Sequence, residues 1–256
     1  MTAVPQIVAH RGASHDHPEH TLAAYEQAIA DGADALECDV RLTADGRLVC
    51  LHDRRVERTS DGRGAVSALT LAQLDALDFG SWKGGGAGPA QVLAFDELLA
   101  LATSAGRPVE LAVETKHPTR WAGRVERELV RQLSLFGLHR TRLGERPRVR
   151  LMSFSRLALR RMAALAPDLP RVLLTERAPL PGRAAALPRG VRIAGPGIEL
   201  VRSRPEIVTR LLAAGHQVHV WTVDDPEDVE LCVRLGVHAL ITNRPAQVRA
   251  QLAAVR

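Results

Sequence analysis

The chain has 256 residues and a formal net charge of +5, and 46% of its residues are hydrophobic. That length suits one large domain with a sizeable core, a common size for a single α/β barrel. The positive charge comes almost entirely from arginines scattered along the sequence. Because no basic cluster is interleaved with aromatic residues, we expect no nucleic-acid partner.

Short β-like runs alternate with amphipathic helical patterns along nearly the whole chain. We predict eight strands: Gln6–His10, Ala35–Leu42, Val109–Lys116, Arg148–Phe154, Arg171–Thr175, Val191–Leu200, Gln217–Val223 and Ala239–Thr242. Helical patterns fall between them: Thr21–Asp31, Asp96–Ser104, Arg120–Phe136, Ser155–Ala166, Pro205–Ala214, Pro226–Leu235 and Pro245–Val255. This alternation predicts a (β/α)₈ TIM barrel in one domain over residues 1–256, with a doubly wound open sheet as the alternative.

Two segments depart from the regular alternation. From about Arg54 to Ala94, turn-forming sequences surround one weak helical pattern, Leu71–Leu77, and a short β-like run, Leu48–Leu51, comes just before. We predict an inserted subdomain after the second strand, at the barrel face where such insertions shape substrate access. The segment Glu176–Arg189 is rich in Pro and Ala and gives the weakest helical pattern.

The sequence also bears on where the protein is found. Its first twelve residues have no basic segment and no long apolar run, and no stretch reaches the roughly 20 apolar residues that cross a bilayer. Three cysteines without metal-type spacing are typical of reduced, buried thiols. We expect a cytoplasmic protein without stable membrane insertion, and the sequence leaves its oligomeric state unknown.

Polar residues gather where the predicted strands end. In an α/β barrel the active site lies at these ends, because the loops that follow the strands converge there. Charged groups in apolar strands are costly to bury unless they are paired or bind a metal. The strand-end residues are His10, Arg11, Glu37, Asp39, His52, Asp53, Glu114, Lys116, Ser153, Glu199, Trp221, Asp224, Thr242 and Asn243.

Three of these residues are carboxylates that form a candidate metal site. Glu37 and Asp39 are two positions apart on one strand, so their side chains point to the same face, and Glu114 joins them if it points inward. Carboxylates this close repel one another unless a cation is present, and oxygen ligands favour Mg²⁺ or Ca²⁺. The alternative is an ion-pair network with the basic residues Arg11, Arg41 and Lys116.

Two histidines and two cations complete the candidate site. His10 and His52 each end a β-like run, and an imidazole can act as a general acid or a general base near neutral pH. Arg11 and Lys116 are suited to a phosphate group, although either could simply pair with a carboxylate. Trp221 ends a strand in a chain with few aromatic residues. It could contact the substrate or pack in the core, and the sequence favours neither role.

The ordered motifs resemble those of the glycerophosphodiester phosphodiesterase family. The first block contains His10–Gly12, Pro18–Thr21, Glu37–Val40 and His52–Asp53. The similarity continues through the RTSDGRGAVSALTLAQLDALDFGSW stretch and the VETKHP, VWTVDDP and ITNRP motifs, so it covers nearly the whole chain. In two places the chain departs from the usual family pattern: His20 stands where the family usually has Asn, and Asn243 where it usually has Asp.

The resemblance implies an activity and a set of roles. It implies hydrolysis of a small glycerophosphodiester to sn-glycerol 3-phosphate and an alcohol, with a divalent metal, Mg²⁺ or Ca²⁺, as cofactor. By that resemblance the acid/base pair is His10 and His52, and the metal ligands are Glu37, Asp39 and Glu114. Phosphate would be bound by Arg11 and Lys116, and Trp221 would contact the glycerol or alcohol portion. Direct attack by water and attack through a cyclic phosphate both stay open.

Three other functions are compatible with the same predicted fold. A lysophospholipase D-type enzyme would need an exposed apolar groove, for which Phe79 and Trp82 in the insertion are candidates. A Schiff-base enzyme would use Lys116 as its nucleophile, but it would leave the histidines and the Glu37–Asp39 pair without a shared role. A non-catalytic glycerophosphodiester-binding barrel should have lost a ligand or a histidine, and none is missing.

Overall fold

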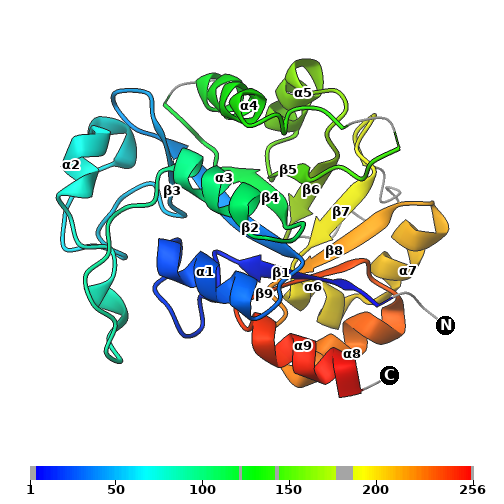
Figure 1. Ribbon diagram of the computed structural model, residues 1–256. Coiled ribbons are helices and arrows are strands. Elements are labelled where there is room, and N and C mark those ends of the chain that lie inside the picture. The colour runs from blue at the N-terminus through cyan, green and yellow to red at the C-terminus, as the bar shows by residue number, and fades with distance from the viewer. Residues whose placement is uncertain (1–3, 121–122, 142–143, 177–186, 255–256) are drawn as a thin grey trace.

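Eight parallel strands close into a barrel in the computed structural model, which describes residues 4–120, 123–141, 144–176 and 187–254 (Figure 1). The barrel order is β1, β2, β4, β5, β6, β7, β8 and β9, and the pairing of β1 with both β2 and β9 closes it. The strands are β1 (Gln6–His10), β2 (Ala35–Leu42), β4 (Glu110–Thr115), β5 (Val149–Ser153), β6 (Arg171–Thr175), β7 (Ile193–Pro196), β8 (Gln217–Trp221) and β9 (Ala239–Thr242). The predicted TIM barrel is therefore confirmed, and the open sheet is excluded.

Helices surround the barrel, and apart from α6, which was not predicted, their bounds agree with the predicted patterns to within a few residues (Figure 1). They are α1 (Leu22–Ala30), α3 (Phe95–Ser104), α4 (Arg124–Leu135), α5 (Arg156–Leu165), α6 (Ile198–Ser203), α7 (Glu206–Ala213), α8 (Pro226–Leu235) and α9 (Pro245–Ala254). Within the described part of the chain, every helix is too short or too polar to span a bilayer.

One predicted strand, Val191–Leu200, is wrong in its second half. The strand β7 ends at Pro196, Gly197 forms an extended N-cap, and the next residues make helix α6. A short apolar run does not distinguish strand from helix, because both bury such residues. Glu199 therefore lies on an exposed helix face paired with Arg202, away from the strand ends. The segment Glu176–Arg189 lies largely outside the described residues.

Alternate residues of each strand point into the barrel, so layers of side chains fill its interior. From one end of the barrel to the other, these layers are polar, apolar and polar. The middle layer is apolar and consists of Val8, Ala35, Ala112, Met152, Val172, Leu174, Ile193, Ala239 and Ile241. We call the polar layer at the C-terminal strand ends the upper mouth; it contains His10, Glu37, Asp39, Glu114 and Trp221. We call the opposite polar layer the lower mouth; it contains Gln6, Glu110, Arg150, Gln217 and His219.

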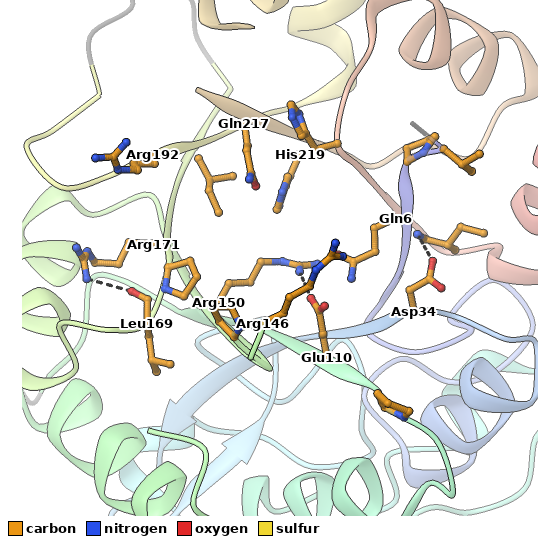
Figure 2. Close-up of a pocket in the computed structure, with 18 of the residues that line it drawn as sticks. Gln6, Asp34, Glu110, Arg146, Arg150, Leu169, Arg171, Arg192, Gln217 and His219 are labelled. Carbon is orange, nitrogen blue, oxygen red and sulfur yellow. Dashed lines mark hydrogen bonds and ion pairs between the residues drawn. The ribbon is translucent and has the colours of Figure 1, made fainter. Parts of the chain in front are cut away.

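The lower mouth opens into a cavity of about 1260 Å³ (Figure 2). Arg150 lies in it with a guanidinium nitrogen 3.0 Å from the carboxylate of Glu110. Five arginines and three carboxylates line this cavity: Arg146, Arg150, Arg171, Arg192, Arg249, Asp34, Glu110 and Asp168. Its volume alone does not make it the active site, because the loops that carry chemistry in this fold converge at the other end.

The segment from Arg54 to Ala94 leaves the barrel after β3 (Leu48–Cys50), which pairs antiparallel with β2. It contains the short elements η1 (Val66–Ala68), α2 (Leu71–Asp75) and η2 (Ser81–Lys83). Its apolar side chains form a small cluster with two residues of the preceding β-run, Val49 and Leu51: the members from the segment are Val56, Val66, Leu74, Phe79 and Val92. The domain boundaries, with an inserted subdomain at about residues 54–94, stay a prediction.

Candidate active site

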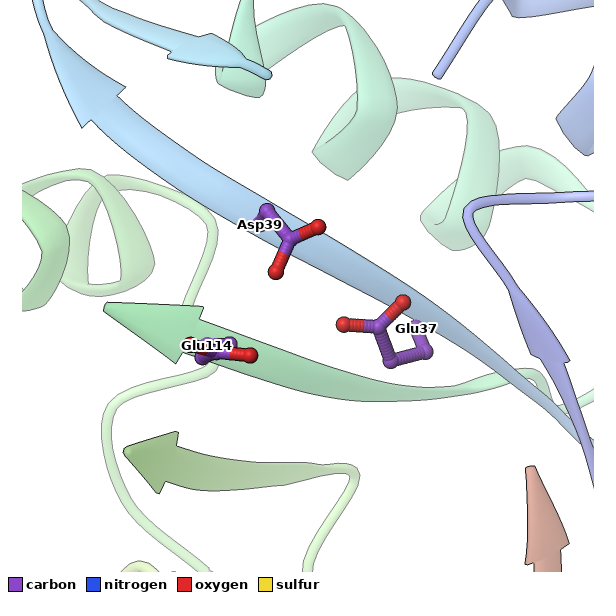
Figure 3. Close-up of side chains that lie close together, drawn as sticks. All are labelled: Glu37, Asp39 and Glu114. Carbon is purple, nitrogen blue, oxygen red and sulfur yellow. The ribbon is translucent and has the colours of Figure 1, made fainter. Parts of the chain in front are cut away.

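Three buried carboxylates meet at the upper mouth (Figure 3). Glu37 and Asp39 project from the same face of β2, and Asp39 lies directly opposite Glu114 in the register of β2 with β4. One oxygen from each carboxylate lies within 4.8 Å of the others. The structure therefore brings together three oxygen ligands that are far apart in the sequence.

The pKa shifts of these carboxyl groups indicate that the positive charges around them do not fully neutralise them. Burial and the neighbouring Asp39 raise the pKa of Glu37 well above its ordinary range and that of Glu114 to about 8. Burial also acts to raise the pKa of Asp39, but Lys116, a hydrogen bond to His20 and Arg11 outweigh it, so that pKa is well below its ordinary range. A trio in which two members resist ionisation fits a site for a divalent cation.

Two cations lie against the carboxylates without balancing them. Nζ of Lys116 is 2.9 Å from Glu114 and 3.3 Å from Asp39. Nε of Arg11 is 3.1 Å from Asp39, and the Arg11 backbone N–H donates to Glu37. The predicted ion-pair network is therefore present in part. Two basic side chains, Arg11 and Lys116, face three carboxyl groups.

Arg41 was predicted as a possible member of this ion-pair network, but its contacts give it a different role. Its guanidinium donates two hydrogen bonds to the backbone carbonyl of His52, at 2.6 and 3.0 Å. It therefore anchors the segment that carries a candidate catalytic histidine.

His20, one of the two departures from the family pattern, contacts the trio directly. Its Nε2 lies 3.0 Å from the Asp39 carboxylate, and its Nδ1 lies 2.8 Å from the hydroxyl of Tyr25. The Tyr25 hydroxyl also donates to the backbone carbonyl of Glu37. His20 therefore links Tyr25 of helix α1 to the Asp39 carboxylate of β2.

Both candidate catalytic histidines border one cavity of about 160 Å³. Nδ1 of His52 lies 2.7 Å from Asp53, and Nδ1 of His10 lies 2.7 Å from Asn243. Burial, followed by the charge of Arg11, lowers the pKa of His10 to about 3. Burial also lowers the pKa of His52, and the charges of Arg11 and Lys116 add to this, while Asp39 and the hydrogen bond to Asp53 oppose the decrease.

Aromatic side chains form one wall of this cavity. The rings of Trp221 and Phe154 meet edge to face, with their centres 5.5 Å apart, and Nζ of Lys116 is 6.0 Å from the centre of the Phe154 ring. The indole N–H of Trp221 donates to the carbonyl of Gly195 at 2.8 Å. Trp221 is thus held by packing and also borders the cavity, so both predicted possibilities apply to it.

Most of the predicted site residues lie around the 160 Å³ cavity. They are His10, Arg11, Glu37, His52, Glu114, Lys116 and Trp221, with Asp39 next to them in the trio. Two strand-end candidates lie elsewhere: Glu199 is on α6, and the buried hydroxyl of Ser153 donates to the backbone carbonyl of Thr115.

Sequence reasoning missed Phe154 and the bracing residues Glu19 and Arg58. Glu19 accepts hydrogen bonds from Arg11 and from Arg58 of the insertion, at 2.8 to 3.0 Å. The signal for each was its place in a quoted motif, since Glu19 lies in Pro18–Thr21 and Arg58 begins the RTSDGRG stretch. The structure thus adds a contact that ties the insertion to the cation beside the trio.

The fold is a TIM barrel, and its upper mouth gathers the carboxyl, basic and imidazole side chains that hydrolysis of a phosphate ester would need. The chain matches the glycerophosphoryl diester phosphodiesterase family over residues 10–247, and it belongs to this family. Its activity is therefore that of a glycerophosphodiester phosphodiesterase.

Individual relatives agree with this assignment. A probable glycerophosphodiester phosphodiesterase 1 of Mycobacterium tuberculosis is 44% identical over 97% of this chain and 92% of its own length. A glycerophosphodiester phosphodiesterase of Bacillus subtilis is 33% identical over 93% of this chain and 83% of its own length. An Oleispira antarctica phosphodiesterase, solved in complex with the product sn-glycerol-3-phosphate, has a TM-score of 0.84 at 26% identity, covering 98% of this chain and 97% of its own.

Proposed function

We propose that this enzyme hydrolyses small glycerophosphodiesters to sn-glycerol 3-phosphate and an alcohol, using a divalent cation and two histidines. The observation that carries the proposal is the buried carboxylate trio beside a cavity that both imidazoles border. The product complex of the Oleispira antarctica phosphodiesterase supports the choice of glycerol 3-phosphate as product.

Glu37, Asp39 and Glu114 would hold the cation, and their oxygen donors suit Mg²⁺ or Ca²⁺. When bound, such an ion neutralises phosphate charge and polarises a coordinated oxygen. The charges also fit. Three carboxylates and two basic residues, Arg11 and Lys116, leave one net negative charge, to which a phosphodiester adds another. A divalent ion balances the sum.

The remaining chemistry belongs to the side chains of the upper mouth. Arg11 and Lys116 would bind the phosphate oxygens. One imidazole accepts the proton of the attacking hydroxyl, from water or from the neighbouring glycerol carbon, and the other protonates the departing alkoxide oxygen. Trp221, with Phe154 beside it, would contact the glycerol or alcohol portion of the substrate.

A coupled assay for glycerol 3-phosphate tests this function. We expect wild-type protein to release it from glycerophosphocholine or glycerophosphoethanolamine with Mg²⁺ or Ca²⁺, and EDTA to abolish the release. His10→Ala and His52→Ala should each lower kcat by about 10²-fold or more, the usual contribution of general acid–base catalysis. Near-normal hydrolysis by His52→Ala would contradict its proposed role.

Particular contacts argue against two of the alternative functions. Phe79 is buried in the apolar cluster of the insertion, and Arg58 and Lys83 lie against the Trp82 ring, so these residues do not form the apolar groove that a lysophospholipid needs. A Schiff-base nucleophile must be an unprotonated amine. Although burial lowers the pKa of Lys116, Asp39 and Glu114 raise it further, which keeps this amine protonated. Comparing glycerophosphocholine with lysophosphatidylcholine tests the first alternative.

A further inference from the structure

One side chain of the insertion, Arg58, binds two carboxylates that lie beyond the ends of different strands. Its Nη1 and Nη2 donate to the two oxygens of Glu19, each at 2.8 Å. Its Nε donates to Oδ2 of Asp53 at 2.5 Å. All three nitrogens of this guanidinium are therefore engaged, and they join the loop after β1 to the segment after β3.

Each of these carboxylates also contacts a residue of the proposed active site. Oε1 of Glu19 accepts a hydrogen bond from Nη1 of Arg11 at 3.0 Å. Oδ1 of Asp53 lies 2.7 Å from Nδ1 of His52. Two chains of contacts thus diverge from Arg58, one to the cation proposed to bind phosphate and one to an imidazole proposed to transfer a proton. Both end residues border the 160 Å³ cavity.

The backbone of Arg11 shows why this residue needs support. Its φ is 57°, in the left-handed region that residues other than glycine seldom adopt. A strained conformation of this kind persists only where the surrounding structure fixes it. Glu19 is one of the groups that fix it, and because its side chain is largely buried, water screens its bonds to the two arginines only weakly.

The insertion holds Arg58 in place by packing. Val56, two residues before it, is buried in the apolar cluster of the insertion, and the guanidinium carbon of Arg58 lies 6.0 Å from the centre of the Trp82 ring. Nζ of Lys83 donates to the backbone carbonyl of Ser14 at 2.6 Å, so the insertion contacts the loop after β1 at a second point. A bidentate contact from a packed support fixes orientation better than an isolated surface ion pair does.

We propose that Arg58 is a positioning residue through which the insertion holds Arg11 and His52 in their places at the cavity. This inference rests on the proposed function, since it concerns the same site. Arg58 is not among the described residues that line the cavity, so it acts through Glu19 and Asp53. Such indirect support matters because a misplacement of about 1 Å can lower a rate by about 10²-fold.

The first test compares two arginines of the insertion. Arg58→Gln should lower kcat/KM for glycerophosphocholine by about 10- to 10²-fold, with KM raised because Arg11 is loosened and kcat lowered because His52 is loosened. Arg55→Gln is the matched control, since this exposed arginine lies three residues away and pairs with Glu57. Its kcat and KM should equal those of wild type. Thermal unfolding checks that both variants are folded at the assay temperature.

Double variants separate the two chains of contacts. Added to Glu19→Gln, Arg58→Gln should no longer raise KM, and added to Asp53→Asn it should no longer lower kcat, because the group it acts through is already changed. Full additivity in both backgrounds would overturn the inference. Arg58→Lys keeps the charge without the planar fork, so it should recover only part of the loss, and it replaces Arg58→Gln if that variant does not fold. Wild-type kinetics in a folded Arg58→Lys protein would also overturn the inference.

NMR spectroscopy gives a readout that does not depend on turnover. In Arg58→Gln we expect the Nε–H of Arg11 to exchange with solvent about 10-fold faster or more, and the ring signals of His52 to shift, whereas Arg55→Gln should change neither. Unchanged signals at both residues in Arg58→Gln would overturn the inference whatever the activity. If these signals change but wild-type protein releases no glycerol 3-phosphate, the proposed function fails while the coupling through Arg58 stands.

Discussion

The two mouths of the barrel both contain buried charge, but they balance it differently. In the lower mouth Arg150 and Glu110 form a one-to-one pair, and arginines outnumber carboxylates around the cavity. In the upper mouth three carboxylates share two cations. The larger cavity lies at the lower mouth. Neither volume nor buried charge therefore distinguishes the two ends, and the proposed catalytic end is the one with an excess of carboxyl groups beside two imidazoles.

One strand allows the two mouths to be compared directly. Glu110 and Glu114 are four residues apart on β4 and both point into the barrel, one at each mouth. We expect Glu114→Gln to lower kcat by about 10²-fold or more, because it removes a proposed metal ligand. Glu110→Gln should change kcat by less than about 2-fold, since distant sites act independently. Equal losses in kcat would contradict the assignment of chemistry to one mouth.

Metal binding should distinguish the mouths in a second way. At a metal concentration of about a hundred times Kd, binding to the folded state adds about 2.7 kcal/mol of stability. For a chain of this size that corresponds to a rise in Tm of about 5–10 °C. Thermal unfolding with Mg²⁺ or Ca²⁺ should show this rise in wild-type protein and in Glu110→Gln, and EDTA should reverse it. A full rise in Glu114→Gln would argue against the trio as the site.

The lower mouth should matter for stability rather than for turnover. Arg150→Met removes the partner of Glu110 and should lower the free energy of unfolding by about 1–3 kcal/mol. The double variant with Glu110→Gln should recover part of that loss, because no carboxylate is left unpaired. Urea unfolding measures both, and kcat should stay near wild type. A large loss of kcat in a folded Arg150→Met protein would contradict the claim that the lower mouth affects stability and not turnover.

The smallest expected effect concerns Glu19, which braces the upper mouth. Burial alone would raise its pKa, but the hydrogen bond from Arg58 and the charge of Arg11 lower it from 4.5 to about 2. The unfolded chain therefore binds more protons between these pH values, and the stability that Glu19 contributes is complete above about pH 4.5 and is lost toward about pH 2. Glu19→Gln should cost about 1 kcal/mol near neutral pH. A difference from wild type that does not shrink below about pH 4.5 would contradict the pairing.

Much of the fold and the composition of the upper mouth could be predicted because they follow from local patterns. The alternation along β2 places Glu37 and Asp39 on one face, and barrel closure then brings His10 beside them. The prediction for the second half of the strand Val191–Leu200 failed because the buried residues Ile198 and Leu200 fit an amphipathic helix as well as a strand.

Contacts between distant segments could not be predicted. Nothing in the sequence pairs His10 with Asn243, 233 positions apart, or Arg58 with Glu19. The charged lower mouth was also missed, because Arg150 and Glu110 resemble surface residues at the start of strands. Such contacts depend on the register and closure of the barrel, which single-segment patterns do not contain.

The seam between β1 and β9 joins the first strand of the barrel to the last, so the contact between His10 and Asn243 exists only when the barrel is closed. Once β2 and β4 have paired, the acidic trio can assemble, but His10 has no acceptor until β9 arrives with Asn243. A partly synthesised or proteolytically shortened chain without β9 could therefore gather the three carboxylates and still lack the contact that holds the His10 ring. Such a fragment would keep the proposed cation site and lose the proposed acid/base geometry.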